Sequence, residues 1–362
     1  MAVQYLILTT LATIIILPVS SCIAHLPVAM LSQAAILLPL LTALGSNASP
    51  LLNKLHKRDN YRTAIDRDFS DPAIMLDTDG KYYAYASSDL NGHEVQVATS
   101  DDGFDWTFQE GVNALTYHAG WTAKDAYTWA PDVHPADGGR YWMYYSATVK
   151  DACGRHCIGF ALGSDPMTFA PAVALNDEPW ACDDEFGLID PSMFQDQDGE
   201  RFVLYKVDGN SKPGNPTPIM IQRVEQDGYT KVGDPIELLR NDETDGPLIE
   251  NPALILVDGI YYLTFSSNWY NSEFYDVSYA TATSVLGPYT KARDPDAPLI
   301  VTDDSKGLWG PGGADMVMSK DGNGAIMVYH NWDHPYVEGE GGNYRGMNAA
   351  RVGFSDGVMT LI

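Results

Sequence analysis

The stretch Ala253-Leu-Ile-Leu-Val-Asp258-Gly259-Ile-Tyr-Tyr-Leu-Thr-Phe265 consists of two apolar runs joined by an Asp-Gly pair. Asp-Gly is a favoured turn of β-hairpins, because both residues tolerate the positive φ that a tight turn needs. The flanking runs are rich in β-branched and aromatic residues, which are enriched in strands. This stretch therefore predicts a β-hairpin.

Similar turns recur along the chain at an almost constant interval. Each lies between strand-like runs, and their glycines are Gly80, Gly139, Gly199, Gly259 and Gly322, at successive spacings of 59, 60, 60 and 63 positions. Further strand-like runs lie between the hairpins, and no long stretch has a clean helical period. Four strands in about sixty residues are typical of a propeller blade, so five units predict an all-β fold, a five-bladed β-propeller.

The amino-terminal part of the chain differs in composition from the rest. Residues 1–53 contain no Asp, Glu, Lys or Arg. An apolar run that begins near Met30 and is followed by small residues is typical of a signal peptide starting there. The dibasic pair Lys57-Arg58 is typical of a propeptide processing site. We therefore expect a leader over 1–58, a catalytic propeller domain over 59–362 and a secreted, extracellular protein. A membrane anchor is the alternative, because the first apolar run could span a bilayer.

Charge restricts the class of partner. The chain has 48 acidic and 22 basic residues and a formal net charge of −26. This charge repels phosphates, so no nucleic-acid partner is expected. The 21 tyrosines and 8 tryptophans supply aromatic faces that pack against apolar C–H surfaces. We expect a monomer that binds a polysaccharide or oligosaccharide and has no membrane contact after processing.

Acidic residues recur near the start of the first strand of several units. Asp71, Asp190 and Glu250 each precede their turn glycine by nine positions, and Asp132 precedes its glycine by seven. The first strands of propeller blades line the central axis, so equivalent positions are expected to converge at one end of it. Converging like charges cost free energy, which indicates a functional site.

Carboxylates gathered in a cleft, in a chain without a phosphate-binding loop or a nucleophile motif, are suited to glycoside hydrolysis. One carboxyl group must donate a proton to the leaving oxygen, and another must activate water or attack carbon. A third can raise the pKa of the donor by repulsion. Glu250 has the longer reach, so we predict that it is the general acid. This reasoning does not divide the other two roles between Asp71 and Asp190.

Two tryptophans are candidates for sugar binding. Trp129 borders the Ala-Pro-Asp132 segment, and Trp269 lies in the Asn-Trp-Tyr-Asn segment that ends the Glu250 blade. Aromatic faces stack on the C–H surfaces of sugars. For Trp129, packing between blades is the alternative role.

Several short motifs in combination resemble glycoside hydrolase family 43. They are Arg67-Asp-Phe-Ser-Asp71-Pro-Ala, Trp129-Ala-Pro-Asp132-Val, Ile189-Asp190-Pro, Glu250-Asn-Pro and Tyr329-His330. The resemblance covers about residues 65–357. It implies a five-bladed propeller glycosidase of the arabinosidase, arabinanase or xylosidase type, which cleaves α-L-arabinofuranosyl or β-xylosyl linkages with inversion. The family usually has a glycine after its acid, where this chain has Asn251.

The resemblance also assigns roles to individual residues. It implies Asp71 as general base, Asp190 as pKa modulator and Glu250 as general acid, with Asp71 and Glu250 roughly 6.5–9.5 Å apart to admit a water. It further implies that Arg345 binds substrate, with an ordinary surface arginine as the alternative, and that Cys157 pairs with Cys182, with Cys153–Cys182 as the rival disulfide.

Metal binding is a separate expectation. The resemblance suggests an axial calcium ion or water cluster with His330 as a ligand, and no cofactor is required for the chemistry itself. Because Ca²⁺ prefers oxygen ligands, waters would fill most positions around a lone histidine. A hydrogen-bonded core histidine is the alternative.

Two other functions stay open from the sequence. One is a retaining propeller glycosidase of the fructan-cleaving type, and the other is a non-catalytic carbohydrate-binding propeller. Within the favoured function, an exo-acting α-L-arabinofuranosidase on plant cell-wall polysaccharide is preferred. Pocket shape decides between arabinose and xylose and between exo and endo action, and residue spacing does not reveal it.

Overall fold

The computed structural model describes residues 62–150, 154–336 and 342–362. The predicted leader over 1–58, with its start at Met30 and its Lys57-Arg58 site, lies outside the described residues, as does Cys153. Within the described part of the chain, no helix has the length and apolar character that crossing a membrane requires.

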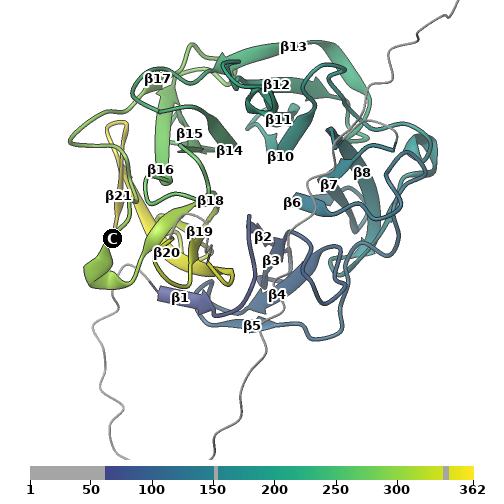
Figure 1. Ribbon diagram of the computed structural model, residues 1–362, viewed down its shortest axis with the longest axis horizontal. Coiled ribbons are helices and arrows are strands. Elements are labelled where there is room, and N and C mark those ends of the chain that lie inside the picture. Colours follow the sequence, from purple (N-terminus) through teal and green to yellow (C-terminus); the bar gives the residue numbers. More distant parts are fainter. Residues whose placement is uncertain (1–61, 151–153, 337–341) are drawn as a thin grey trace, which may run out of the picture. The chain divides into compact units, whose positions relative to one another are not determined.

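Five antiparallel sheets stand in a ring around a central axis (Figure 1). Blade I comprises β2 (Ala73–Leu76), β3 (Tyr82–Ala86), β4 (Gln96–Ser100) and β5 (Trp106–Phe108). Blade II comprises β6 (Thr128–Ala136), β7 (Arg140–Thr148), β8 (His156–Asp165) and β9 (Thr168–Pro171). Blade III comprises β10 (Leu188–Gln195), β11 (Arg201–Val207), β12 (Ile219–Val224) and β13 (Lys231–Leu239).

The remaining two sheets complete the ring. Blade IV comprises β14 (Ile249–Val257), β15 (Ile260–Ser267), β16 (Asp276–Ala282) and β17 (Thr290–Lys291). Blade V comprises β18 (Trp309–Met318), β19 (Ala325–Trp332), β20 (Arg345–Ser355), β21 (Val358–Leu361) and β1 (Arg62–Ile65). The described helices are three 3₁₀ turns, Val173–Leu175, Gly209–Ser211 and Asp304–Lys306. The prediction of an all-β, five-bladed propeller is confirmed.

The repeated turns form the hairpins between the first and second strands of the blades. All five turn glycines have positive φ, between 69° for Gly139 and 85° for Gly199. A residue with a Cβ is strained in this conformation, which explains the regular spacing of glycine.

The core consists of apolar layers between neighbouring blades. Tyr85 of blade I and Met143 of blade II belong to one buried cluster, and Phe160 of blade II packs with Val203 of blade III in the next. Similar clusters join blades III and IV, IV and V, and V and I. The inner strands of each sheet therefore bury both faces, which explains why many of them read as almost continuous apolar runs, whereas outermost strands such as β13 are largely exposed.

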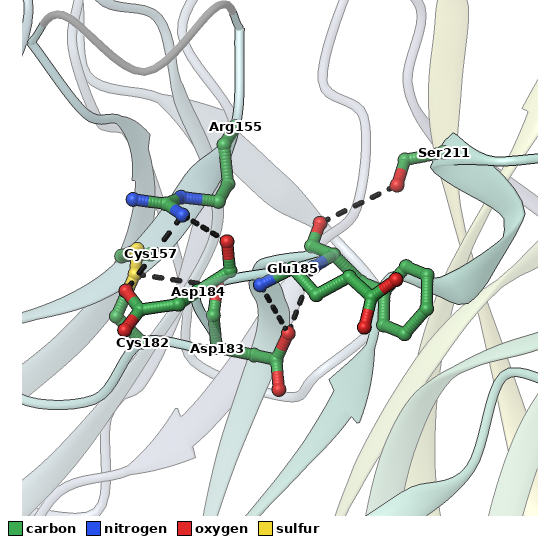
Figure 2. Close-up of a disulfide and its surroundings, with 8 residues drawn as sticks. Arg155, Cys157, Cys182, Asp183, Asp184, Glu185 and Ser211 are labelled. Carbon is green, nitrogen blue, oxygen red and sulfur yellow. Dashed lines mark hydrogen bonds and ion pairs between the residues drawn. A yellow bond between two sulfur atoms is a disulfide. The ribbon is translucent and has the colours of Figure 1, made fainter.

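Two features connect distant parts of the chain. Strand β1 pairs antiparallel with β20, with Ile65 opposite Met347, so the beginning of the described chain joins the last blade. A disulfide links Cys157 of β8 to Cys182, with Cα atoms 4.7 Å apart (Figure 2). This is the pairing that the family resemblance implied.

Candidate active site

A pocket of about 430 Å³ lies at the end of the axis where the innermost strands begin. Its charged lining residues come from four blades. Aromatic side chains lie among them, and together these residues are Asp68, Asp71, Asp190, Lys206, Asp208, Glu250, Arg345, Tyr127, Trp129, Trp269 and Tyr270. The three predicted catalytic carboxyl groups therefore face one cavity.

A backbone feature at the start of each innermost strand shapes the pocket floor. One equivalent position in each blade has positive φ, between 42° and 58°, and the residues at this position are Asp71, Ala130, Asp190, Asn251 and Gly313. In four blades the next residue is proline. The five residues occupy equivalent positions, so Glu250 lies one residue before the position of Asp71 and Asp190, and Asp132 lies two residues after it. The expectation that Asp71, Asp190 and Glu250 occupy matching positions was wrong for Glu250, although the pocket brings the three together.

The backbone N–H of this residue is held by a side chain of the preceding blade. Ala130 donates to Ser87 Oγ, Asp190 to Ser146 Oγ and Gly313 to Ser266 Oγ, at 2.8–3.0 Å. In blade I, Asp71 donates to His330 Nδ1 at 3.0 Å. A hydrogen bond from backbone to side chain therefore joins each of these blades to the preceding blade at the floor of the pocket.

Blade IV departs from this pattern. The N–H of Asn251 donates to Asp190 Oδ2 at 3.0 Å. Lys206 lies on β11 opposite Ile189, where the other blades carry their serine or histidine. Because Asp190 accepts the Asn251 N–H, the Lys206 ammonium is available to the pocket.

Asp71 has the environment of an ionised carboxylate. Arg345 Nη1 donates to its Oδ1 at 3.0 Å, and Ser87 Oγ donates to its Oδ2 at 2.8 Å. Burial acts to raise the pKa of Asp71, but the Arg345 guanidinium and the Ser87 hydroxyl outweigh it and hold the pKa below its ordinary value. This side chain can accept a proton from water.

Asp190 has the opposite environment. Burial, followed by the negative charge of Glu250, raises its pKa well above the ordinary value, although Lys206 and the Asn251 N–H act against this. Asp190 therefore retains its proton at a pH where Asp71 is ionised. Two neighbouring carboxyl groups in a low-dielectric site do not both ionise readily.

Glu250 is held at both oxygens. Lys206 Nζ donates to Oε2 at 2.8 Å, and the Tyr275 hydroxyl donates to Oε1 at 2.9 Å. Lys206 also lies 3.1 Å from Asp208 Oδ1. Its ammonium is buried, but Glu250 and Asp208 raise its pKa, so it remains charged. These contacts fix the direction in which the Glu250 carboxyl group points.

His330 is buried and stacks on Tyr275, with ring centroids 5.8 Å apart. Its Nδ1 accepts the Asp71 N–H, so its Nε2 carries the proton, and this atom lies 3.3 Å from Arg345 Nη1. Burial and the Arg345 charge lower the pKa of His330 to about 3. A ring in this state has no free lone pair for a metal, and the described residues contain no group of three or more His, Cys, Asp or Glu that could hold one. The calcium site stays a prediction that the present neighbours of His330 do not fit, and we derive no step through it.

The three residues predicted to bind sugar all line the pocket. Trp129 stacks on His156 with ring centroids 3.7 Å apart and leaves part of its indole exposed. Trp269 is 43% exposed. Arg345 places its guanidinium carbon 4.9 Å from the Tyr270 ring centroid, and it also binds Asp71.

Sequence reasoning missed three residues that act on the carboxyl groups: Lys206, Tyr275 and Ser87. A signal existed only for Lys206, which interrupts the apolar strand run 202–207, where a charged residue is rarely buried without a purpose. Tyr275 and Ser87 look like ordinary strand and turn residues.

Comparisons with known proteins agree with this geometry. The sequence model of "Glycosyl hydrolases family 43" matches residues 61–359. The chain is 25% identical over 275 residues to a β-D-galactofuranosidase of Aspergillus niger, covering 72% of this chain and 73% of that protein. It is 24% identical over 284 residues to an extracellular exo-α-(1→5)-L-arabinofuranosidase of Streptomyces avermitilis, covering 75% of this chain and 56% of that protein. A solved structure, a thermostable family-43 glycoside hydrolase, superposes with a TM-score of 0.70 at 29% identity, covering 81% of this chain and 92% of that one.

Proposed function

The chain belongs to family 43 of the glycosyl hydrolases and is a glycosidase, and we propose that it cleaves α-L-arabinofuranosyl linkages of plant cell-wall polysaccharide with inversion of the anomeric carbon. One observation carries this proposal. Three carboxyl groups line one pocket, and their surroundings differ: Asp71 beside a cation, Asp190 buried beside another acid, and Glu250 held by an ammonium and a phenol. Inverting hydrolysis needs such a division between base and acid.

The proposed roles follow from these surroundings. Asp71 is the general base: it takes a proton from a water that attacks the anomeric carbon. Glu250 is the general acid: it gives a proton to the glycosidic oxygen as the bond between that oxygen and the anomeric carbon breaks. Asp190 is the modulator. Burial, followed by the charge of the neighbouring Glu250, raises the pKa of Asp190 well above its ordinary value.

The proposal of an arabinofuranosyl substrate rests on the relatives. The Aspergillus protein is named a galactofuranosidase and the Streptomyces protein an arabinofuranosidase, so both act on five-membered sugar rings. The exposed faces of Trp129 and Trp269 suit stacking on such a ring. A β-xylosyl linkage is the second candidate, because the sequence motifs are common to arabinosidases and xylosidases.

We also propose that the protein acts outside the cell. The leader pattern of residues 1–58 and the word "extracellular" in the name of the Streptomyces relative support this. The Cys157–Cys182 disulfide is consistent with an oxidising compartment.

A substrate panel tests the reaction and the sugar. Arabinan, arabinoxylan, xylobiose and the p-nitrophenyl glycosides of arabinofuranose and xylopyranose are incubated with the protein, and the anomer first released is followed by NMR. We expect arabinose from the arabinofuranosides, released as the inverted β-anomer. A retained anomer contradicts the mechanism, release of xylose alone contradicts the sugar, and no turnover anywhere supports a carbohydrate-binding propeller instead.

Substitution of the acid tests its role. Glu250→Gln is expected to lower kcat on arabino-oligosaccharides about 10²–10⁴-fold, the usual contribution of general acid catalysis. The loss should be smaller on the p-nitrophenyl glycoside, whose leaving group needs little protonation. Glu243→Gln, an exposed carboxylate outside the pocket, is the matched control. Equal losses on both substrates would argue against Glu250 as the acid.

A further inference from the structure

A second pocket lies beside the active site. It has a volume of about 500 Å³, and its walls include Pro213, Asn215 and Pro216 from the loop between β11 and β12, and Pro247 from the loop before β14. Trp269 and Asn210 line both pockets. The two cavities are therefore neighbours that share an indole and an amide.

The lining of this pocket suits a sugar ring. Three prolines and an indole that is 43% exposed offer flat C–H and π surfaces, on which the apolar faces of sugars pack. Between the two pockets, Asn210 Oδ1 is buried and has no hydrogen-bond partner among the described residues. Because that oxygen is enclosed, the polar contact with a sugar falls to the Nδ2 group of the same amide, a hydrogen-bond donor on a residue that lines both pockets.

The loop that forms one wall is held in shape. Ser211 Oγ donates to the Phe186 carbonyl at 3.4 Å, close to the disulfide segment (Figure 2). Asn215 Nδ2 donates to the Lys212 carbonyl at 3.0 Å. A side chain at Gly209 would collide with the Pro216 carbonyl, so the loop closes on itself only with glycine there. A preformed wall of this kind reduces the entropy lost on binding.

The position of the pocket indicates which part of a substrate it receives. Its walls come from blades III and IV, the blades that carry Lys206 and Glu250. Asp71 and Arg345, by contrast, come from blades I and V. A general acid protonates the leaving oxygen, so the leaving group extends on the side of Glu250.

We propose that the second pocket is a subsite for the leaving-group portion of a saccharide chain, and that it binds a sugar unit beyond the one attached to the scissile bond. This inference rests on the proposed function and deepens it. The preferred substrate is then an oligosaccharide or polysaccharide whose chain continues past Trp269, rather than a short glycoside.

The test obstructs the subsite without touching the catalytic pocket. Asn215→Trp fills it from one wall, and Pro247→Trp fills it from the other. Each variant is assayed on α-1,5-linked arabinotetraose and on p-nitrophenyl α-L-arabinofuranoside, which has no sugar beyond the scissile bond. Glu243→Trp, on the exposed part of the same loop as Pro247, is the matched control.

The expected result is a change in the ratio of the two activities. In both obstructed variants kcat/KM for the tetraose falls at least about tenfold relative to the aryl glycoside, because binding energy from remote sugars is lost, and the control keeps the ratio of the unaltered protein. If the variants melt like the parent and the ratio stays constant, the subsite proposal is overturned. If the unaltered protein cleaves neither substrate, the proposed function fails instead. Two variants on different walls keep the test decisive if one of them does not fold.

Discussion

Asp71, Asp190 and Glu250 are chemically similar side chains, and their neighbours make them different. Asp71 accepts hydrogen bonds from a guanidinium and a hydroxyl, which favour its ionised form. Asp190 accepts a backbone N–H, but burial and the adjacent glutamate favour its protonated form. The identity of the residue therefore does not set the ionisation of Asp71 and Asp190; burial, nearby charges and hydrogen-bond donors set it together.

Arg345→Met tests the ionisation of Asp71. The guanidinium helps to hold the pKa of Asp71 below its ordinary value, so its removal raises that pKa. A general base works only when ionised, and the rate falls as pH drops through its pKa. The acid limb of the kcat/KM profile should therefore move to higher pH, with about tenfold lower activity for each pH unit below the displaced limb.

The profile is measured on the p-nitrophenyl glycoside between pH 3 and 8. Arg351→Met is the matched control, because this arginine also lies on β20 but pairs with Asp321 outside the pocket. An acid limb that stays in place in Arg345→Met, with only KM increased, would mean that Arg345 binds sugar and does not tune Asp71.

At the scale of strands, the sequence predicted the blades more accurately than the positions within them. Asp71, Asp190 and Glu250 all precede their turn glycine by nine residues, yet Glu250 is not equivalent to the other two. The hairpin after β14 has the two-residue turn Asp258-Gly259, whereas the turns after β2 and β10 have five residues, 77–81 and 196–200. After its positive-φ residue, β14 is one residue longer than β2 and β10, but its turn places the glycine two positions earlier. Gly259 therefore follows Asn251 by eight positions instead of nine, and the acid that lies nine positions before Gly259 is the preceding residue, Glu250.

The contacts of Lys206 could not have been predicted in the same way. Lys206 occupies the position at which other blades carry a serine or histidine that accepts a backbone N–H. It is available to Glu250 only because Asp190 accepts the Asn251 N–H. The replacement of the usual serine or histidine acceptor by Asp190 depends on how blade III packs against blade IV, and no local sequence pattern predicts it.

Two further acids join blades at their inner strands. Asp132 Oδ2 accepts the Met193 N–H at 2.5 Å, and Asp315 Oδ2 accepts the Ile74 N–H at 2.8 Å. Each acid lies two residues after the positive-φ residue of its strand, on β6 and β18. Burial, followed by the charge of Asp132, raises the pKa of Asp315 to about 7.

This raised pKa predicts pH-dependent stability. Between about pH 4 and 7 the folded state holds a proton on Asp315 that the unfolded chain releases, so the free energy of unfolding falls as pH rises through that window. The change is up to about 4 kcal/mol, at 1.36 kcal/mol per pKa unit. Asp315→Asn cannot ionise and should lose this part of the dependence.

Urea unfolding of both proteins at pH 4.5, 6 and 7.5 measures the difference. His134, which pairs with Asp132 at 3.0 Å, has its pKa raised in part by the charge of Asp315, so both proteins also carry His134→Gln to remove this second titration. Parallel stability curves for the parent and the variant would show that Asp315 is ionised throughout this range.

At the scale of the whole propeller, closure of the ring depends on one short strand. β1 and β21 share the outer edge of β20, and β1 alone carries the beginning of the described chain into the last blade. Its pairing with 347–349 lies directly after Arg345, the residue that binds Asp71. Phe69, four residues past Ile65, also donates its N–H to the Arg345 carbonyl at 2.9 Å. Ring closure and the geometry of the base are therefore coupled.

A chain that begins at Asp66 lacks β1, whereas a chain that begins at Asp59 keeps it and serves as the control. Loss of β1 removes the burial of Ile65, which is 5% exposed, at about 1.5–3 kcal/mol, and several backbone hydrogen bonds at about 0.5–1.5 kcal/mol each. We expect the melting temperature to fall by roughly 10 °C. Because the edge of β20 next to Arg345 is then unpaired, kcat should fall more than the remaining folded fraction explains. A shorter chain that melts and turns over like the control would show that blades I and V hold together without β1, through the apolar layer that contains Ile74 and Ile326 and the hydrogen bonds that Asp71 and Ile74 make to blade V.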